Sequence, residues 1–225
     1  LTFETKSAET LAFATISALL PQAVLGLFSG ILIDRWSRKW IMILSDSFIA
    51  FCTFILAVLF YFGQAEVWAI YTLLALRSVG SAFHMPSMQA SIPLLAPESQ
   101  LLRVAGINQI IQSVCNIAGP ALGALAITML VLMLDVAGAL LACTSLLFVT
   151  IPNPKPGETK TKLNLWQDLR EAQREVTSHK RMTLLFLLSI LATLFIMPIS
   201  VLFPLMTLNH FSGSAYQMSL VEAIW

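Results

Sequence analysis

The stretch GILIDRWSRK, residues 30–39, joins two long apolar segments, residues 11–33 and 41–62. A helix needs roughly 20 apolar residues to cross a lipid bilayer, and both segments are that long. Further segments of the same kind follow, and another begins near Gln217. They are residues 67–86, 104–126, 131–150 and 182–207. The sequence therefore predicts an all-α membrane protein.

The composition of the whole chain supports this prediction. Of its 225 residues, 57% are apolar and 11% are charged, whereas a soluble domain carries about 25% charged residues. The mean hydropathy is +0.81, and the formal net charge is +1. Such a chain has too little polar surface for a water-soluble globule. The same composition excludes a disordered chain, a disulfide-stapled secreted fold and a nucleic-acid binder.

The loop within residues 30–39 holds an acid followed by cations. These charged residues are Asp34, Arg35, Arg38 and Lys39. Gly30 permits close helix packing, and a carboxylate at position 34 is favoured if it faces a helix N-terminus. Ordinary loop charge explains the cations but not a glycine and an aspartate at this spacing. We interpret the loop as a charge network, with Asp46 in the next segment as a further member.

The cationic residues are concentrated in alternate loops. Of the 13 Lys and Arg residues, 11 lie in the loops after the first, third and fifth segments, whereas Lys6 lies on the opposite side. Cytoplasmic loops are the Lys/Arg-rich ones. We therefore predict a multi-pass cell-membrane protein whose cationic loops are cytoplasmic and whose Leu1 lies outside.

Prolines and charges divide the chain into three parts. We expect a membrane domain over residues 1–151, a cytoplasmic linker over residues 152–181, and the start of a second membrane domain over residues 182–225. The linker contains an amphipathic helix from residue 164 to about 178. We interpret this helix as a connector against the membrane rather than a regulatory docking helix. The turn near residues 127–131 has no glycine, proline or asparagine, so either it is very tight or residues are missing there.

Two charged residues lie inside apolar segments. Arg77 is in mid-segment, where a central arginine costs about 2.5–3.5 kcal/mol, so it should face an interior cavity or a partner. Asp135 lies nearer the outer end of its segment. Both are candidates for proton coupling. The alternatives are a structural ion pair for Arg77 and a helix cap for Asp135, while His84 is interpreted as an interfacial side chain.

A polar stripe and two prolines mark candidate substrate contacts. The stripe, at helical spacing, consists of Gln109, Gln112 and Asn116. Lipid offers these amides no hydrogen-bond partner, so we expect them to face a cavity. Pro198 and Pro204 interrupt backbone hydrogen bonding, and such breaks in transporters often lie near substrate sites. A kinked packing helix is the alternative.

The sequence offers no cofactor or metal site. Its three cysteines lie in apolar segments without metal-binding spacing, and the chain has no phosphate-binding loop of the GxxxxGK[ST] type. We expect no metal, no cofactor and no catalytic residue.

Several of these residues resemble motifs of the major facilitator superfamily. Residues 30–39 are similar to its motif A, Gly-x-x-x-Asp-Arg-x-Gly-Arg-Lys, with Ser37 in place of the second glycine. Arg77 resembles the motif B arginine, although Gly80 falls one residue early. A further set resembles motif C, which marks the family's antiporters, with two of its glycines replaced. It consists of Gly106, Gly119, Pro120 and Gly123.

The whole chain is similar to the macrolide-efflux branch of that superfamily, from the end of the first helix to the start of the eighth. The resemblance implies twelve helices in two halves with substrate bound between them. We therefore expect an N-terminal six-helix half without its first helix, the linker and the seventh helix. Because the chain starts without Met and stops within an apolar segment, we expect it to be part of a longer protein.

The resemblance also implies a function. We expect export of a hydrophobic, macrolide-like drug in exchange for protons, giving antibiotic resistance without enzymatic chemistry. The expected partners are the drug, protons and the lipid bilayer, and the full-length carrier is expected to be monomeric. Two alternatives stay open: export of a siderophore or lipid-like metabolite, and a non-transporting membrane scaffold or assembly partner.

Overall fold

The computed structural model describes residues 8–125, 128–152, 165–211 and 217. The described residues form α-helices and one 3₁₀ turn and include no strand. The helices are α2 (Ala8–Ile33), α3 (Arg38–Tyr61), α4 (Val67–Leu95), α5 (Leu101–Leu125), α6 (Thr128–Phe148), α7 (Leu165–Ser178) and α8 (Lys180–Asn209). The six complete membrane segments that were predicted coincide with the long helices, and α7 coincides with the predicted amphipathic helix. Apart from Gln217 itself, the segment predicted to begin near that residue lies outside the described residues.

Helix α4 is longer than predicted. The predicted segment ends at Pro86, but the helix continues through Pro86 and Pro93 to Leu95. A proline inside a helix removes one backbone hydrogen bond, and groups on neighbouring helices can offset that loss in a membrane protein. Pro93 leaves the Gln89 carbonyl without its helical donor, and Arg38 Nη1 donates to the adjacent Ala90 carbonyl oxygen at 2.9 Å. The predicted segment was therefore shorter than the helix.

Four helices of the described part, α2, α3, α6 and α8, are long and apolar enough to cross a membrane by length and composition. Helices α4 and α5 have sufficient length but carry more polar side chains, including the central arginine of α4 and the amide stripe of α5. Polar residues in membrane helices are expected to face other protein groups or a cavity. Functional groups are therefore expected on α4 and α5.

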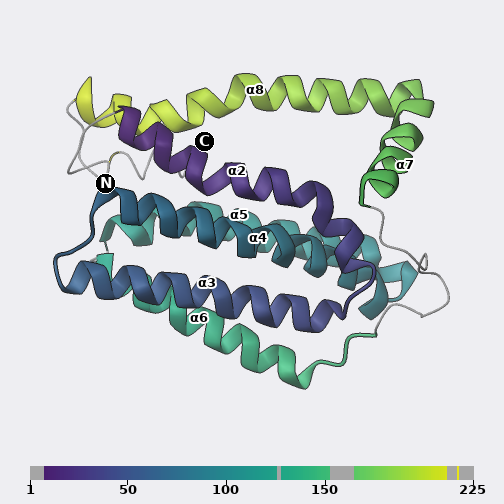
Figure 1. The fold of residues 1–225 in the computed structure, drawn as a ribbon, viewed down its shortest axis with the longest axis horizontal. Helices are drawn as coiled ribbons and strands as arrows, with labels where there is room; N and C mark the ends of the chain where they lie inside the picture. Colours follow the sequence, from purple (N-terminus) through teal and green to yellow (C-terminus); the bar gives the residue numbers. More distant parts are fainter. Residues whose placement is uncertain (1–7, 126–127, 153–164, 212–216, 218–225) are drawn as a thin grey trace.

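The long helices form a layered bundle in which α3 lies between α4 and α6 (Figure 1). Helix α2 packs against the other side of α4, and α8 runs beyond α2. The backbone N–H of Gln22, next to Pro21, donates to Ser78 Oγ at 3.0 Å and so joins α2 to α4. Helix α7 crosses one end of the bundle (Figure 1).

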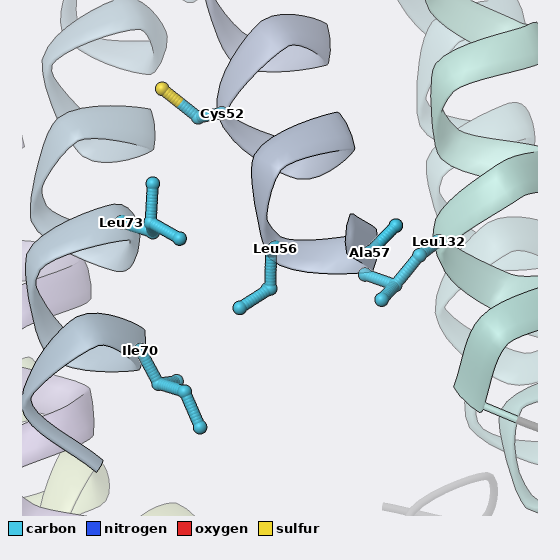
Figure 2. Close-up of a cluster of buried hydrophobic side chains, with 6 residues drawn as sticks. All are labelled: Cys52, Leu56, Ala57, Ile70, Leu73 and Leu132. Carbon is cyan, nitrogen blue, oxygen red and sulfur yellow. The ribbon is translucent and has the colours of Figure 1, made fainter. Parts of the chain in front are cut away.

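The buried core lies where α3 contacts α4 and α6. Figure 2 shows Ile70 and Leu73 of α4 on one side of α3 and Leu132 of α6 on the other, next to Ala57. The buried side chains of this core are Cys52, Leu56, Ala57, Ile70, Leu73 and Leu132. Small residues on α3 let its neighbours approach, and larger aliphatic groups fill the remaining space. Close packing of this kind is the main attraction between helices in lipid, where the hydrophobic effect is weak.

Two glycines have clear structural reasons. Gly63 has φ +66° in the turn between α3 and α4, a conformation that glycine adopts without steric cost. Gly80 lies where α4 approaches α3, because a Cβ atom there would be 2.6 Å from Ile49 Cγ1 and 3.3 Å from the Ser45 carbonyl oxygen. By contrast, a Cβ atom at Gly30 would meet nothing within 4 Å. The close contact predicted for Gly30 is thus absent from the described residues.

The predicted turn at residues 127–131 differs from the observed helix bounds. Helix α5 ends at Leu125 and α6 begins at Thr128, so residues 128–131 are helical. The connection itself, residues 126–127, lies outside the described residues. Whether it is a tight turn or a place where residues are missing stays a prediction.

Candidate functional site

Three helices bring polar side chains together beside the core. Arg77 on α4 donates from Nη2 to Asp135 Oδ2 on α6 at 2.9 Å. The Thr53 hydroxyl on α3 donates to the same carboxylate oxygen at 2.7 Å. Thr53 is fully buried, whereas the side chains of Arg77 and Asp135 are 28% and 42% exposed. We call these residues the Thr53–Arg77–Asp135 cluster.

The cluster lies one helical turn from the apolar core. Asp135 follows Leu132 by three residues, and Arg77 follows Leu73 by four, which are spacings that share a helix face. Leu73 and Leu132 appear on opposite sides of α3 in Figure 2. In the other direction along α4, Gly80 brings α3 and α4 into close contact. The charges are therefore held between an apolar layer and a tight helix crossing.

The two charges of the cluster offset each other's cost in an apolar environment. At an effective dielectric constant near 20, unit charges 4 Å apart attract by about 4 kcal/mol, against about 1 kcal/mol in water. A proton on Asp135 would remove the carboxylate charge and leave Arg77 without an anionic partner. Protonation of Asp135 would therefore remove the ionic contact between α4 and α6.

The charged loop of residues 30–39 is anchored to α4. Arg38 Nη2 lies 3.5 Å from Asp34 Oδ1, and Nη1 of the same guanidinium donates to the Ala90 carbonyl. Arg38 is mostly buried, with a 13% exposed side chain, whereas that of Asp34 is 73% exposed. The buried arginine thus fixes the start of α3 against the end of α4, and the carboxylate lies at the surface. Arg35 lies in the same loop.

Lys39 fixes the start of α3 to the end of α6. Its Nζ donates to the carbonyl oxygens of Leu147 and Val149, each at 2.9 Å. The last carbonyls of a helix have no partner within the helix, and a cation there also interacts favourably with the helix dipole. Arg38 and Lys39 therefore connect α3 to two different helices.

The contact that the structure gives Asp46 is with His84. The Asp46 carboxylate Oδ1 lies 2.8 Å from His84 Nδ1, and both side chains are largely buried. The prediction that Asp46 joins the charged loop therefore differs from its observed partner, and His84 is not simply an interfacial side chain. Helical spacing explains both departures, because one turn beyond Gly80 brings His84 to the face of α4 that meets α3.

The predicted stripe on α5 lies at the surface of the described part of the chain. Gln109, Gln112 and Asn116 are exposed, and a Cβ atom added to Gly106 or Gly119 would meet nothing within 4 Å. Pro120 and Gly123 lie within α5, but their side-chain surroundings are outside the described set. The structure therefore does not bring these residues into the Thr53–Arg77–Asp135 cluster.

An apolar groove of ≈ 840 Å³ lies between α2 and α8. Pro198 is part of its lining, with Ile16 on α2 and Phe186 and Met197 on α8 among its neighbours. Pro204 lies further along α8, and its side-chain surroundings are outside the described set. Of the two predicted prolines, Pro198 is therefore the one placed at an apolar groove.

Thr53 was missed by the sequence analysis. A threonine inside a membrane helix usually bonds to the carbonyl four residues before it, and Thr53 does so with Ile49 at 3.0 Å. Its second acceptor, Asp135, is 82 residues away in the chain. No local pattern gives that contact. The available signal was a hydroxyl at mid-depth in one apolar helix, with charged residues at similar depth in two others.

The comparison with protein families is decisive for identity. The family model described as Major Facilitator Superfamily matches residues 2–225. The chain belongs to this superfamily. Its members are transporters, and the apolar helices of this chain place it in a membrane. No solved structure matches the chain.

Within the superfamily, the chain is similar to curated transporters. It is 36% identical over 228 residues to "Macrolide efflux protein A" of Streptococcus pyogenes, an alignment that covers 99% of this chain and 56% of that protein. It is 35% identical over 214 residues to the Enterococcus faecalis protein of the same name, covering 92% of this chain and 66% of that protein. "Uncharacterized MFS-type transporter YfiS" of Bacillus subtilis is 37% identical over 108 residues, covering 48% of this chain and 25% of that protein. The chain thus spans 56% of the length of the S. pyogenes relative.

In this superfamily member, charged contacts recur along α3 and α4. Arg38 and Asp34 lie at the loop, Asp46 pairs with His84 further in, and the cluster of Arg77 and Asp135 follows beyond Gly80. Most of each helix between these contacts is apolar. Polar contacts thus lie at several depths within the described helices, and the deepest of these is the α4–α6 ion pair to which Thr53 of α3 adds a hydrogen bond.

Proposed function

We propose that this chain forms part of a secondary active transporter that exports a hydrophobic, macrolide-like compound in exchange for protons. The observation that carries the proposal is the Arg77–Asp135 ion pair, at 2.9 Å, inside helices of a transporter family. The similarity to two proteins named for macrolide efflux supports the substrate class. Proton coupling and the macrolide-like substrate are proposed for the complete carrier.

The depth of the ion pair suits a proton site. Asp135 is the eighth residue of α6 and Arg77 the eleventh of α4, so at 1.5 Å per residue they lie about 10 and 15 Å along their helices. The hydrocarbon core of a bilayer is about 30 Å thick. With the cationic loops in the cytoplasm, these helix starts are at the outer surface. Asp135 would then be nearer the outside, from which the driving proton comes.

Proton exchange at Asp135 changes the helix contacts. When the carboxylate is ionised, it accepts hydrogen bonds from Arg77 and Thr53 and holds α3, α4 and α6 together. When it takes a proton, Arg77 loses its anionic partner and the attraction between α4 and α6 weakens. A transporter needs a contact of this kind, because the ion must favour one conformation over another to drive a cycle.

The available energy is sufficient for drug export. Moving one charge through a potential of about 100 mV contributes about 2.3 kcal/mol, and a gradient of about one pH unit adds roughly 1.4 kcal/mol. One proton per molecule would therefore sustain roughly a 500-fold gradient of a neutral substrate, since each 1.4 kcal/mol is about tenfold. The proposed exchange needs no nucleotide.

Accumulation of a labelled macrolide in everted membrane vesicles carrying the complete polypeptide tests this proposal. We expect uptake when the vesicle interior is acidified and loss of uptake when a protonophore is added. Competition by siderophores or lipid-like compounds, with no macrolide uptake, would move the assignment to another exported metabolite. Absence of any energised uptake by the folded protein would contradict the transporter proposal.

A further inference from the structure

The Thr53 hydroxyl has two acceptors and a single hydrogen to share between them. Its Oγ1 lies 2.7 Å from Asp135 Oδ2 and 3.0 Å from the Ile49 carbonyl oxygen. The residue is fully buried, so water is not at hand as an alternative partner. A hydroxyl carries one donor hydrogen and two acceptor lone pairs. It can therefore donate to one of these oxygens while its own oxygen remains free to accept.

We infer that Thr53 is a positioning residue that supports both protonation states of Asp135 by turning its hydroxyl hydrogen from the carboxylate to the Ile49 carbonyl. The inference rests on the proposed function, because it concerns the same proton site. It adds a residue on α3 to a site that sequence analysis placed on α4 and α6 alone.

In the ionised state, the hydroxyl donates to Asp135. Arg77 donates to the same oxygen, so the carboxylate accepts two hydrogen bonds, one of which is charge-assisted. The Ile49 carbonyl keeps its own helical hydrogen bond. In this state, one carboxylate on α6 accepts hydrogen bonds from both α3 and α4.

In the protonated state, the same hydroxyl reverses its role. The proton taken up by Asp135 makes its carboxyl group an O–H donor, and the Thr53 oxygen accepts from it. The threonine hydrogen then turns to the Ile49 carbonyl, a bond that threonines commonly make within helices. No covalent bond of Thr53 forms or breaks, and the proton on Asp135 comes from solution. A buried polar group is thus satisfied in each state, which matters because an unsatisfied one costs about 1–3 kcal/mol.

Other hydroxyls of the bundle show why Thr53 is unusual. Thr15 and Thr72 donate to the carbonyls of Leu11 and Trp68, four residues before them, at 2.9 Å. Within the described part of the chain, neither hydroxyl bonds to a carboxylate. Thr72 lies on α4, five residues before Arg77 of the cluster, and it is exposed. It is therefore a matched control for loss of a helix-bonding hydroxyl without loss of the carboxylate contact.

Among the described residues, few other titratable groups lie near Thr53. The neighbouring helices contribute Arg77 and Asp135, and α3 itself contributes the buried thiol of Cys52. Asp46 and His84 form their own pair, about 10 Å further along α3 by the helical rise. Changes in the proton equilibrium of Asp135 on substitution of Thr53 can therefore be interpreted through these groups.

An infrared titration of the purified full-length carrier tests the inference. The carbonyl band of protonated Asp135 is identified by its disappearance in Asp135→Asn, and its intensity is followed against pH. In Thr53→Val the half-maximal pH should rise by about one unit, because a hydrogen bond to a charged group is stronger than one to its neutral form. Thr53→Ser, which keeps the hydroxyl, and Thr72→Val should both follow the unsubstituted protein.

Equal titrations of Thr53→Val and the unsubstituted protein would overturn the inference, as would equal shifts in the Ser and Val variants. If Thr53→Val does not fold, Thr53→Cys is titrated instead, because its thiol is only a weak donor and the same upward shift is expected. If Thr53→Val shows the expected titration shift but the unsubstituted carrier takes up no macrolide, the proposed substrate is contradicted and the role of Thr53 is supported. The two proposals therefore fail on separate readouts.

Discussion

A guanidinium on one membrane helix and a carboxylate on another stabilise each other when they are in contact. Arg77 and Asp135 lie 2.9 Å apart, and Thr53 supplies a further hydrogen bond to the carboxylate. Removing one partner of a poorly solvated ion pair leaves the other charge uncompensated, which is more damaging than removing both. This asymmetry distinguishes a true pair from two residues that lie near each other by chance.

The first prediction uses this asymmetry. Arg77→Met and Asp135→Asn should each lower the free energy of unfolding in detergent, and their two losses should sum to more than the loss in the double variant. We expect a coupling of about 1–3 kcal/mol, reduced toward the lower end because both side chains are partly exposed. Thermal or denaturant unfolding of the four proteins measures it. Combining Arg77→Met with Asp46→Asn is the control, since Asp46 contacts His84, and full additivity in both cycles would contradict the pairing.

The second prediction concerns Gly80. An added Cβ atom would lie 2.6 Å from Ile49 Cγ1, so Gly80→Ala should destabilise the bundle by about 1–3 kcal/mol through overpacking. Ile49→Ala removes the clashing atoms and should recover part of that loss. Gly26→Ala is the matched control, because its Cβ atom would meet nothing within 4 Å. Equal stability of Gly80→Ala and Gly26→Ala would show that α3 and α4 do not approach at this point.

At the scale of the helix, α3 organises the bundle. Its middle packs between α4 and α6 (Figure 1), and its first turn carries two cations that bond to the ends of those same helices. Arg38 bonds to α4 at the Ala90 carbonyl, and Lys39 bonds to α6 at its last carbonyls. A movement of α3 would therefore be transmitted to both neighbours.

The third prediction follows from the Lys39 contacts. Lys39→Met should release the carbonyls of Leu147 and Val149 and loosen the end of α6. A lost hydrogen bond to a charged group is worth about 1.5–3 kcal/mol in a buried setting, and an exposed one such as this is expected to give a rise in amide exchange of roughly fivefold. Hydrogen exchange with mass spectrometry measures it. Lys39→Arg, which keeps the positive charge, is the control. An unchanged amide exchange rate at the end of α6 in Lys39→Met would show that Lys39 does not hold that end in place.

The helices themselves were largely predictable, because each is a run of apolar residues of the length that a membrane requires. The partners of their polar residues were not. A charged arginine inside a membrane helix costs free energy, so the sequence predicted a cavity or a partner for Arg77. It did not say that α6 rather than another helix supplies that partner. Asp46 was assigned to the nearby loop, whereas its contact is His84 on α4. Which helices are neighbours is set by packing over long sequence distances.

Helix α4 shows the same limit for boundaries. The predicted apolar segment ended at Pro86, but the helix continues for nine residues to Leu95. Gly30 was expected to mark a close contact, and the close contact lies at Gly80 instead. Local residue preferences describe what a position tolerates, and the neighbouring helices decide which of those options is used.

At the scale of the whole molecule, large apolar surfaces remain on α5 and α8. Leu102 and Ile110 on α5, and Leu185 and Phe195 on α8, are more than half exposed in the described chain. In a membrane protein such surfaces contact lipid or further helices. The chain spans 56% of the length of its S. pyogenes relative, so a transport assay requires the complete carrier.

The most direct test of the account is proton leakage from everted vesicles that carry the full-length protein and hold an acidic interior. Addition of a macrolide should release protons through the unsubstituted protein and through Glu98→Gln, a control for loss of an exposed acid. Release should be lost in Asp135→Asn and Arg77→Ala, because each lacks half of the pair that binds the proton. Macrolide-dependent leakage that persists unchanged in folded Asp135→Asn would contradict the central claim that this ion pair couples protons to export.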